Sequence, residues 1–314
     1  CKASGDPHFF TYDGQKIDFM GTCQYTLSRS LIKNDECAFN VEVKNEARKR
    51  SKPNVSWVRS VYFTIYGVRV KLHLRKKLYI NEKRAYPPVS LANGRLNIIR
   101  SGKSLEATTE CGIRVKFDGV HLVKVKVPKK YSGRMTGLCG DCNGVKDDLR
   151  LANGTDVTDV AKGRFEMIAV SPSIECAKST KKVVSRDDSC GMIRKTDGPF
   201  AKCIESLGTD VMNYFDECTY DACSYEGSPE DIKGSVCKSL EAFAADCEDA
   251  GIVVRWRTAN FCPLPCGENM KYNPAMSGCQ ETCSGLPPLD QCPIDLSEGC
   301  ECEDGFVLSG DGCV

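Results

Sequence analysis

Hydrophobic and polar residues alternate along several segments in the first half of the chain. In residues 68–75, 113–117 and 123–127, every second residue is aliphatic or aromatic, and the residues between them are Lys, Arg or His. This period of two is typical of strands with one buried face. Gly, Asn and Asp separate the runs, as turns require. Residues 1–176 are therefore predicted to form an antiparallel β-sandwich or a barrel-like sheet.

The hydrophobic period changes after Cys176. Apolar residues now recur at steps of three and four, which is typical of helices that bury one face. Each stripe also contains a cysteine, so we expect a small helical module over 189–265 that is stapled through its core. Residues 177–188 are mostly polar and are predicted to be a linker. The stripes are Phe200, Cys203, Ile204 and Leu207; Val211, Tyr214, Phe215 and Cys218; and Leu240, Phe243, Ala244 and Cys247.

From Cys262 onward neither period continues, and eight cysteines, Cys262 included, lie among Pro and Gly. Such a segment cannot fold on hydrophobic burial alone, so we expect 266–314 to be an irregular module held by disulfides. The chain has 21 Cys in 314 residues. This density predicts an oxidising compartment and a secreted, extracellular protein. Asn54 and Asn153 lie in sequons for N-glycans. We also expect the chain to be a fragment of a longer protein.

Charge is divided unevenly between the two halves. Residues 1–176 hold 31 Lys and Arg against 18 Asp and Glu, whereas 177–314 hold 12 against 24. The halves could dock on each other, or the basic half could bind a polyanion such as an anionic glycan. Nucleic acid is excluded as a partner by the expected compartment. No apolar run approaches the ~20 residues of a membrane-spanning helix.

Residues 141–148 contain the densest cluster of side chains that can supply oxygen ligands to a cation, arranged around a glycine. The segment lies between the predicted strands and a polar stretch of sequence. Calcium takes six to eight oxygen ligands from carboxylates, amides and backbone carbonyls. The loop is not an EF-hand, because the glycine comes too early and no Glu follows at the twelfth position. We expect a Ca²⁺ site, with a solvated acidic turn as the alternative. The candidate ligands are Asp141, Asn143, the carbonyl of Val145, Asp147 and Asp148.

Several motifs together resemble the type D assembly of von Willebrand factor and gel-forming mucins. The opening at 1–14, with Gly-Asp-Pro-His, and the run Gly-Leu-Cys-Gly-Asp-Cys-Asn-Gly at 137–144 resemble the start and end of a type D domain. The cysteines at 190–262 are similar to those of the eight-cysteine module, and 266–314 is similar to a trypsin-inhibitor-like module. The resemblance follows the family's order along nearly the whole chain.

The resemblance implies features that the residues alone do not. It implies that Asp6 is a further calcium ligand, and that disulfides join Cys1 to Cys139 and Cys23 to Cys176. The sequence also departs from the family. Thr136 stands where relatives often have Cys, and Cys142 replaces an aromatic residue. From Cys266 onward there are seven cysteines where the family has ten.

An odd number of cysteines leaves at least one without a partner inside the chain. Cys142, Cys292 and Cys313 are the candidates for an intermolecular thiol. We expect the unpaired cysteine to lie in the last module and Cys142 to pair internally; a Cys142 link between two chains is the alternative. Cys139 and Cys142 have the spacing of an oxidoreductase motif, but two structural half-cystines are favoured.

No catalytic motif or nucleophile–base pair is recognisable, so we do not expect an enzyme. His8 is predicted to be buried, and His73 and His121 to be surface or edge residues. The sequence predicts a secreted, calcium-binding structural glycoprotein module that joins other copies or domains of an adhesive, gel-forming or matrix multimer. The alternatives are a protease inhibitor that uses the last module and a module that binds anionic glycans.

Overall fold

The computed structural model describes residues 1–5, 7–18, 21–32, 35–47, 56–148, 176–208, 211–285 and 296–314. The chain divides into two compact units. One consists of Cys1–Ile99 and Ser104–Pro172, and the other of Arg100–Lys103 and Ser173–Val314. Among the described residues, no helix is long and apolar enough to cross a membrane.

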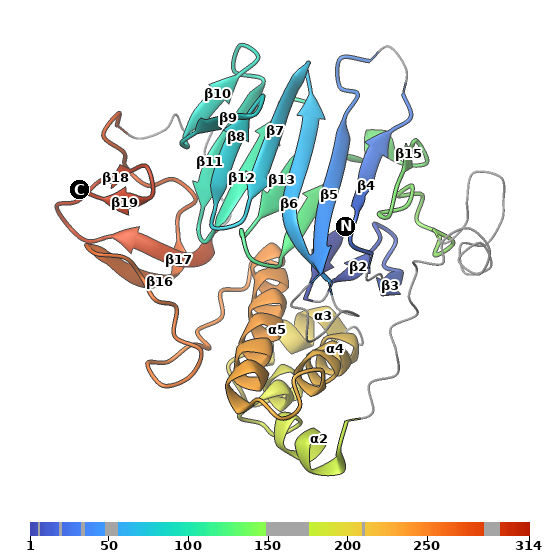
Figure 1. The fold of residues 1–314 in the computed structure, drawn as a ribbon, viewed down its shortest axis with the longest axis vertical. Helices are drawn as coiled ribbons and strands as arrows, with labels where there is room; N and C mark the ends of the chain where they lie inside the picture. Colours follow the sequence, from blue (N-terminus) through green and yellow to red (C-terminus); the bar gives the residue numbers. More distant parts are fainter. Residues whose placement is uncertain are drawn as a thin grey trace. The chain divides into compact units, whose positions relative to one another are not determined.

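The first unit contains two sheets whose assigned strand pairs are all antiparallel (Figure 1). The eight-stranded sheet has the order β10-β11-β12-β13-β14-β1-β2-β3. Its strands are β1 (Lys2–Ser4), β2 (His8–Phe10), β3 (Lys16–Asp18), β10 (Val89–Leu91), β11 (Leu96–Ser101), β12 (Ser104–Thr109), β13 (Arg114–Phe117) and β14 (Val123–Lys126).

The seven-stranded sheet has the order β15-β4-β5-β6-β7-β8-β9. Its strands are β4 (Gln24–Ser30), β5 (Asn40–Ala47), β6 (Ser56–Ile65), β7 (Val68–His73), β8 (Lys77–Ile80), β9 (Lys83–Ala85) and β15 (Met135–Thr136). A short 3-10 helix, η1 (Lys129–Tyr131), precedes β15. The predicted alternating segments thus form β7, β13 and β14, with boundaries that differ by one or two residues.

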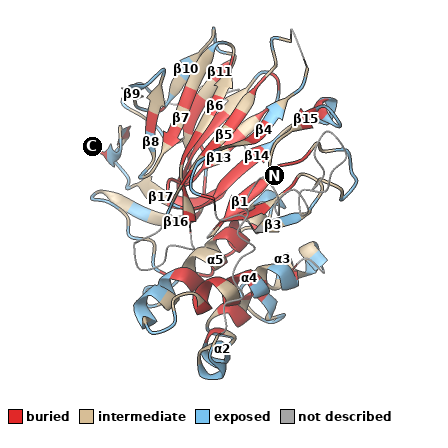
Figure 2. Cartoon of the chain, turned by 45° about the vertical axis from the view of Figure 1, so that its right-hand side comes forward, coloured by how far each residue is buried: buried red, intermediate tan, exposed pale blue. Residues whose placement is uncertain are grey.

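One hydrophobic core joins the two sheets. Phe63 and Leu72 of the seven-stranded sheet and Val115 and Val123 of the eight-stranded sheet are fully buried and belong to the same cluster. Their neighbours along each strand are more exposed, so red and lighter positions alternate along strands such as β6 and β7 in Figure 2. The predicted sandwich class is confirmed, because only facing apolar surfaces produce a single shared core.

Two disulfides close the first unit, Cys1–Cys139 and Cys37–Cys111. The first is the pair that the family resemblance implies. It spans 138 residues, and closing so long a loop contributes up to about 4–5 kcal/mol in the chain-entropy view. The implied Cys23–Cys176 disulfide is wrong: Cys23 is a free, exposed thiol, and Cys176 pairs with Cys223.

The second unit begins with a small helical module. Its elements are α2 (Lys178–Val184), the 3-10 helix η2 (Cys190–Arg194), α3 (Ala201–Leu207), α4 (Val211–Cys223) and α5 (Pro229–Asp249). The three predicted stripes lie on or beside α3, α4 and α5 and contribute to one core. Four disulfides pass through or beside this core: Cys176–Cys223, Cys190–Cys218, Cys203–Cys247 and Cys237–Cys262.

Local sequence sets both ends of α5. Pro229 occupies the start of the helix, where its missing N–H is not needed, and Glu230 and Asp231 in the first turn favour the helix dipole. At the other end Gly251 takes a positive φ of 77°. The Gly251 N–H donates to Glu248 O and the Ile252 N–H to Cys247 O, each at 2.9 Å. This is a Schellman ending, which favours glycine.

The prediction that residues 177–188 form a linker is partly wrong. Residues 178–184 form α2, and Val184 is fully buried in the core of the helical module. The polar composition reflects an exposed face, since Val183 next to it is 58% exposed. A single buried residue on two turns is too weak a signal for hydrophobic periodicity to detect.

The last module contains two small antiparallel pairs. Strand β16 (Met270–Met276) pairs with β17 (Ser297–Cys302), and β18 (Leu308–Ser309) with β19 (Gly312–Cys313). The disulfides Cys266–Cys300 and Cys302–Cys313 hold it together. The expectation that Cys313 is an intermolecular thiol is therefore wrong. Cys283 is free and exposed instead, and Cys292 lies outside the described residues.

A buried charge network lies in the second unit. The carboxylate of Glu298, whose side chain is 2% exposed, accepts hydrogen bonds from Lys103 Nζ at 2.7 Å and from Arg257 Nε and Nη2 at 2.9 Å. The Tyr272 hydroxyl donates to it at 3.1 Å. Glu241 is a second anion, paired with both Lys103 and Arg257. Burial raises the pKa of Tyr272 well above its usual range, and the Glu298 charge adds to this.

Candidate metal centre

Two loops of the first unit meet at the acidic segment. One is the turn between β2 and β3, which contains Asp13; the other follows β15 and contains residues 140–148. The Tyr12 N–H donates to Cys139 O at 2.9 Å, and the Cys139 N–H donates to Leu27 O at 2.8 Å. With the Cys1–Cys139 disulfide, these bonds fix the second loop against the first.

Three carboxylates converge there. Oxygen atoms of Asp13, Asp141 and Asp148 all lie within 4.8 Å of one another. Asp13 accepts the backbone N–H groups of Asn143 at 3.1 Å and Gly144 at 2.8 Å. The Asp141 N–H donates to Asp148 Oδ1 at 3.1 Å. The backbone amides thus orient the carboxylates and leave lone pairs for a further partner.

Of the three carboxylates, Asp148 lies in the environment that most disfavours its charged form. Its Oδ2 is buried without a hydrogen-bond partner. Burial raises the pKa of Asp148, and the charges of Asp13 and Asp141 add to this, although hydrogen bonds from Thr11 and the Asp141 amide act in the other direction. Gly140 makes the close approach feasible, because a Cβ there would lie 1.8 Å from Asp148 Oδ1.

This arrangement fits a hard cation. Ca²⁺–oxygen distances are about 2.3–2.6 Å, so two ligands on opposite sides of one ion are about 5 Å apart. Carboxylate oxygens that all lie within 4.8 Å of one another can therefore ligate the same ion. Three clustered carboxylates repel one another unless a proton or a cation offsets the charge. A cation would also give the buried Asp148 Oδ2 a partner.

The candidate ligands from the sequence are only partly brought together. Asp141 and Asp148 belong to the cluster, but Asp147 does not. The side-chain oxygen of Asn143 accepts the Val145 N–H at 2.6 Å, and the Val145 carbonyl accepts the Asp147 N–H at 2.9 Å. Neither oxygen is therefore free of other bonds.

Asp6 lies outside the described residues, as do the sequon residues Asn54 and Asn153. Sequence reasoning missed Asp13, which supplies the third carboxylate. The signal was present, because Asp13 precedes Gly14 within the same opening motif that suggested Asp6. Only the contact between the two loops shows that this aspartate faces residues more than 120 positions away.

Cys142 is a free thiol beside this site. Its motif partner Cys139 is bonded to Cys1, so the two do not form a redox-active pair. Cys142 is half-buried. Burial raises the pKa of its thiol, and the charge of Asp13 adds to this, whereas oxidoreductase cysteines have lowered values. The expected internal pairing of Cys142 is wrong.

The histidines follow the predictions in part. His8 is buried, as expected, and His73 is half-buried on β7. The surface assignment of His121 is wrong: it is 4% exposed, with its Nδ1 3.1 Å from Asp118 Oδ2. Burial by itself raises the pKa of Asp118, but His121 and the backbone amides of 120 and 122 lower it to about 2.

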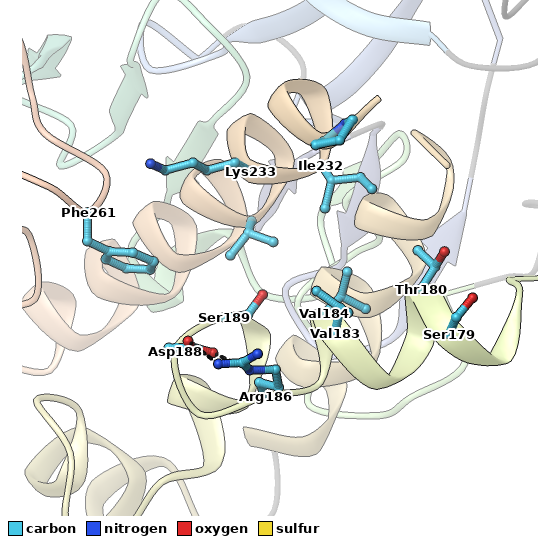
Figure 3. Close-up of a pocket in the computed structure, with 12 residues that line it drawn as sticks. Ser179, Thr180, Val183, Val184, Arg186, Asp188, Ser189, Ile232, Lys233 and Phe261 are labelled. Atoms are coloured by element: carbon cyan, nitrogen blue, oxygen red, sulfur yellow. Dashed lines mark hydrogen bonds and ion pairs between the residues drawn. The ribbon is translucent and has the colours of Figure 1, made fainter. Parts of the chain in front are cut away.

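The helical module contains a cavity of about 500 Å³ between α2 and the first half of α5 (Figure 3). Its lining combines apolar residues with polar ones, and it contains no histidine or cysteine. Arg186 of the lining is held by two hydrogen bonds from its guanidinium to Asp188. The cavity suits an apolar group but offers no nucleophile–base pair. Its apolar lining residues include Val183, Val184, Ile232, Val236 and Phe261.

The fold and disulfides define a multi-module, disulfide-rich β-sandwich assembly, and comparison with known families gives the same order. Residues 1–155 match the von Willebrand factor type D domain, 189–263 the C8 domain, and 266–314 the trypsin inhibitor-like cysteine-rich domain. The chain belongs to the von Willebrand factor type D assembly family.

Curated relatives are similar along the whole chain. Zonadhesin of Mus musculus is 33% identical over 328 residues, alpha-tectorin of Homo sapiens 32% over 332, and the IgGFc-binding protein of Homo sapiens 34% over 321. Each alignment covers 100% of this chain. The chain spans only 6%, 15% and 6% of the respective relatives' lengths.

Proposed function

We propose that this chain is a calcium-binding structural module of a secreted adhesive, gel-forming or matrix protein. The observation that carries the calcium proposal is the convergence of Asp13, Asp141 and Asp148, with the buried Oδ2 of Asp148 lacking a partner. A bound Ca²⁺ supplies a fixed positive charge that offsets the three carboxylates. It would tie the β2–β3 turn to the loop after β15, and so reinforce the contact between Tyr12 and Cys139.

The calcium proposal is tested by thermal unfolding and calorimetry of the full chain, with and without Ca²⁺ after chelation. At free Ca²⁺ a hundredfold above Kd, binding stabilises the folded state by about 2.7 kcal/mol. Asp13→Asn should weaken binding strongly. Asp147→Asn is the matched control, since it removes a carboxylate from the same loop that lies outside the cluster. Equal binding by both variants, or a melting curve insensitive to Ca²⁺ and chelator, would contradict the proposal.

The secreted, structural part of the proposal is supported by the eight assigned disulfides. Such a framework persists in oxidising compartments. The role is non-enzymatic: the modules hold a rigid shape, and other copies or domains of the parent protein are the partners. The free thiols Cys23, Cys142 and Cys283 are the candidates for covalent joining.

Covalent joining is tested by non-reducing electrophoresis of the secreted chain. Cys23→Ser and Cys283→Ser remove exposed thiols, and Cys142→Ser removes the half-buried one. Loss of a covalent dimer in one variant alone identifies the linking residue. A wild-type chain that stays monomeric under oxidising conditions would refute covalent joining by this chain.

Protease inhibition is the weaker candidate. It requires an exposed, cleavable loop near 292–300. Ser297, Glu298 and Gly299 are instead buried in β17, and 286–295 lies outside the described residues. Titrating trypsin with the chain measures this activity directly.

A further inference from the structure

The outer face of the seven-stranded sheet has an unusual arrangement of aromatic and basic side chains. In the strand register Tyr62 of β6 lies beside Lys71 of β7, Lys71 beside Tyr79 of β8, and Tyr79 beside Arg84 of β9. Strands β6, β7, β8 and β9 are neighbours in the sheet (Figure 1). Aromatic and cationic residues therefore alternate along one line across these four strands. With strands about 4.8 Å apart, the line is roughly 14 Å long.

Close contacts extend this line into a ladder. Arg69 Cζ lies 4.6 Å from the Tyr62 ring centroid, and Lys71 Nζ lies 5.4 Å from Tyr62 and 5.3 Å from Tyr79. Arg84 Cζ lies 5.6 Å from Tyr79 and 4.6 Å from Tyr86. The six residues Arg69, Tyr62, Lys71, Tyr79, Arg84 and Tyr86, here termed the cation–aromatic ladder, form one continuous series.

The alternation of the strands turns the ladder outward. The intervening residues Phe63, Val70, Leu72 and Leu78 are fully buried in the core, so the ladder side chains lie on the opposite face of the sheet. Tyr86 is 56% exposed, and the other ladder residues are partly exposed.

The ladder carries excess positive charge. Glu42 lies 3.6 Å from Arg69, but within the described residues no carboxylate forms an ion pair with Lys71. Burial lowers the pKa of His73, two residues further along β7, and the charges of Lys71, Arg59 and Lys77 lower it further. Burial is the larger cause, but the neighbouring cations also produce a positive local field that would attract anions.

Cation–π contacts at exposed sites stabilise a fold only weakly. The stability of the fold therefore does not explain why a row of cations and aromatic rings lies on an exposed face of the sheet. Guanidinium and ammonium groups bind sulfate and carboxylate groups by charge-assisted hydrogen bonds. Exposed tyrosine rings pack against the apolar C–H faces of sugar rings. A regular row of cationic side chains and tyrosine rings is therefore complementary to a polymer in which anionic groups alternate with flat rings.

We propose that the cation–aromatic ladder is a binding site for an anionic polysaccharide, with Arg69, Lys71 and Arg84 contacting sulfate or carboxylate groups and Tyr62, Tyr79 and Tyr86 packing on sugar rings. An acidic polypeptide would use the cations but not the flat rings. This site uses strands β6–β9 and Tyr86 directly after β9. It is independent of the calcium proposal, so failure of one leaves the other standing.

The test measures binding of a heparin oligosaccharide to the full chain at physiological salt. Lys71→Gln with Arg84→Gln should raise Kd at least tenfold and reduce the slope of log K against log salt by about two, since two ionic contacts are lost. Lys129→Gln with Lys130→Gln is the matched control, because it removes the same charge from the same unit away from the ladder. The control should change Kd less than threefold.

Three further measurements separate the alternatives. Tyr79→Leu, which keeps every charge, should weaken heparin binding at least threefold. Poly-glutamate should bind at least tenfold more weakly than heparin of equal charge. In the unmodified chain, bound heparin should protect Lys71 from acetylation more than Lys129, a readout that requires no variant to fold. No heparin binding, equal loss in both double variants, equal binding of poly-glutamate, or equal protection of the two lysines would each overturn the proposal.

Discussion

Replacing Glu298 with Gln tests how the buried charge network stabilises the second unit. The carboxylate is 2% exposed and is the shared acceptor of Lys103, Arg257 and Tyr272. The substitution keeps the shape but removes the anion that both buried cations share, and leaves Glu241 as their remaining ion-pair partner among the described residues. Removing one partner of a buried pair costs about 3–5 kcal/mol, because the remaining charge is not compensated.

Urea unfolding with intact disulfides measures this loss. With a slope of about 2 kcal/mol per molar urea, the midpoint of the unit should fall by about 1.5–2.5 M. Asp188→Asn is the control, because its pair with Arg186 has side chains 67% and 63% exposed. Pairs of that kind contribute no more than about 1 kcal/mol.

A second variant separates charge from packing. Arg257→Met combined with Glu298→Met removes one cation and one anion and leaves Lys103 paired with Glu241 at 2.9 Å. Since one cation and one anion are removed together, the net charge of the network is that of the wild type, and the double variant should be more stable than Glu298→Gln alone. The reasoning is refuted if Glu298→Gln costs no more than the Asp188 control, or if the double variant is the less stable of the two.

Three further outcomes are expected. Heparin binding should raise the pKa of His73, followed by NMR titration of its ring protons, because the added anion offsets the field of neighbouring cations; an unchanged value would argue against binding at the ladder. Iodoacetamide should label Cys23 and Cys283 faster than the half-buried Cys142 in non-reducing peptide maps; equal rates would contradict the described burial. The pKa of Asp118 is lowered to about 2, against about 4 in an unfolded chain, so its carboxylate adds about 2 kcal/mol to the free energy of unfolding above pH 4. This stability is lost as the pH falls toward 2. Asp118→Asn should remove the loss from acid unfolding curves, and a loss that persists in this variant would show another origin.

Much of the fold could be predicted from short-range pattern. The alternation at 68–75 predicts β7, and the stripe from Leu240 to Cys247 predicts the buried face of α5. These periods follow from backbone geometry, so a sequence shows them directly. Residues 178–184 are the counterexample, because a short helix that buries Val184 has no period to detect.

Contacts between distant segments could not be predicted in the same way. Asp13 joins Asp141 and Asp148 only because two loops meet. The ladder depends on strand register: the sequence shows that Lys71 and Tyr79 lie on alternating positions, but not that they are neighbours. Cysteine parity correctly required an unpaired thiol, yet the free ones include Cys23 and Cys283, which parity cannot distinguish from the rest.

The Cys1–Cys139 disulfide has a mechanical consequence for a module that bears tension. A pulling force that reaches Cys1 passes across the sulfur–sulfur bond to Cys139, so the intervening strands carry no load. The bond spans 138 residues, which is roughly 450–500 Å of extended chain at about 3.3–3.6 Å per residue. That length cannot be drawn out while the bond is intact. Reduction of this one bond makes extensible only the part outside the loop that Cys37–Cys111 closes, which spans 74 residues. The bond therefore sets how far the module can stretch, and redox chemistry, more than unfolding, controls its compliance.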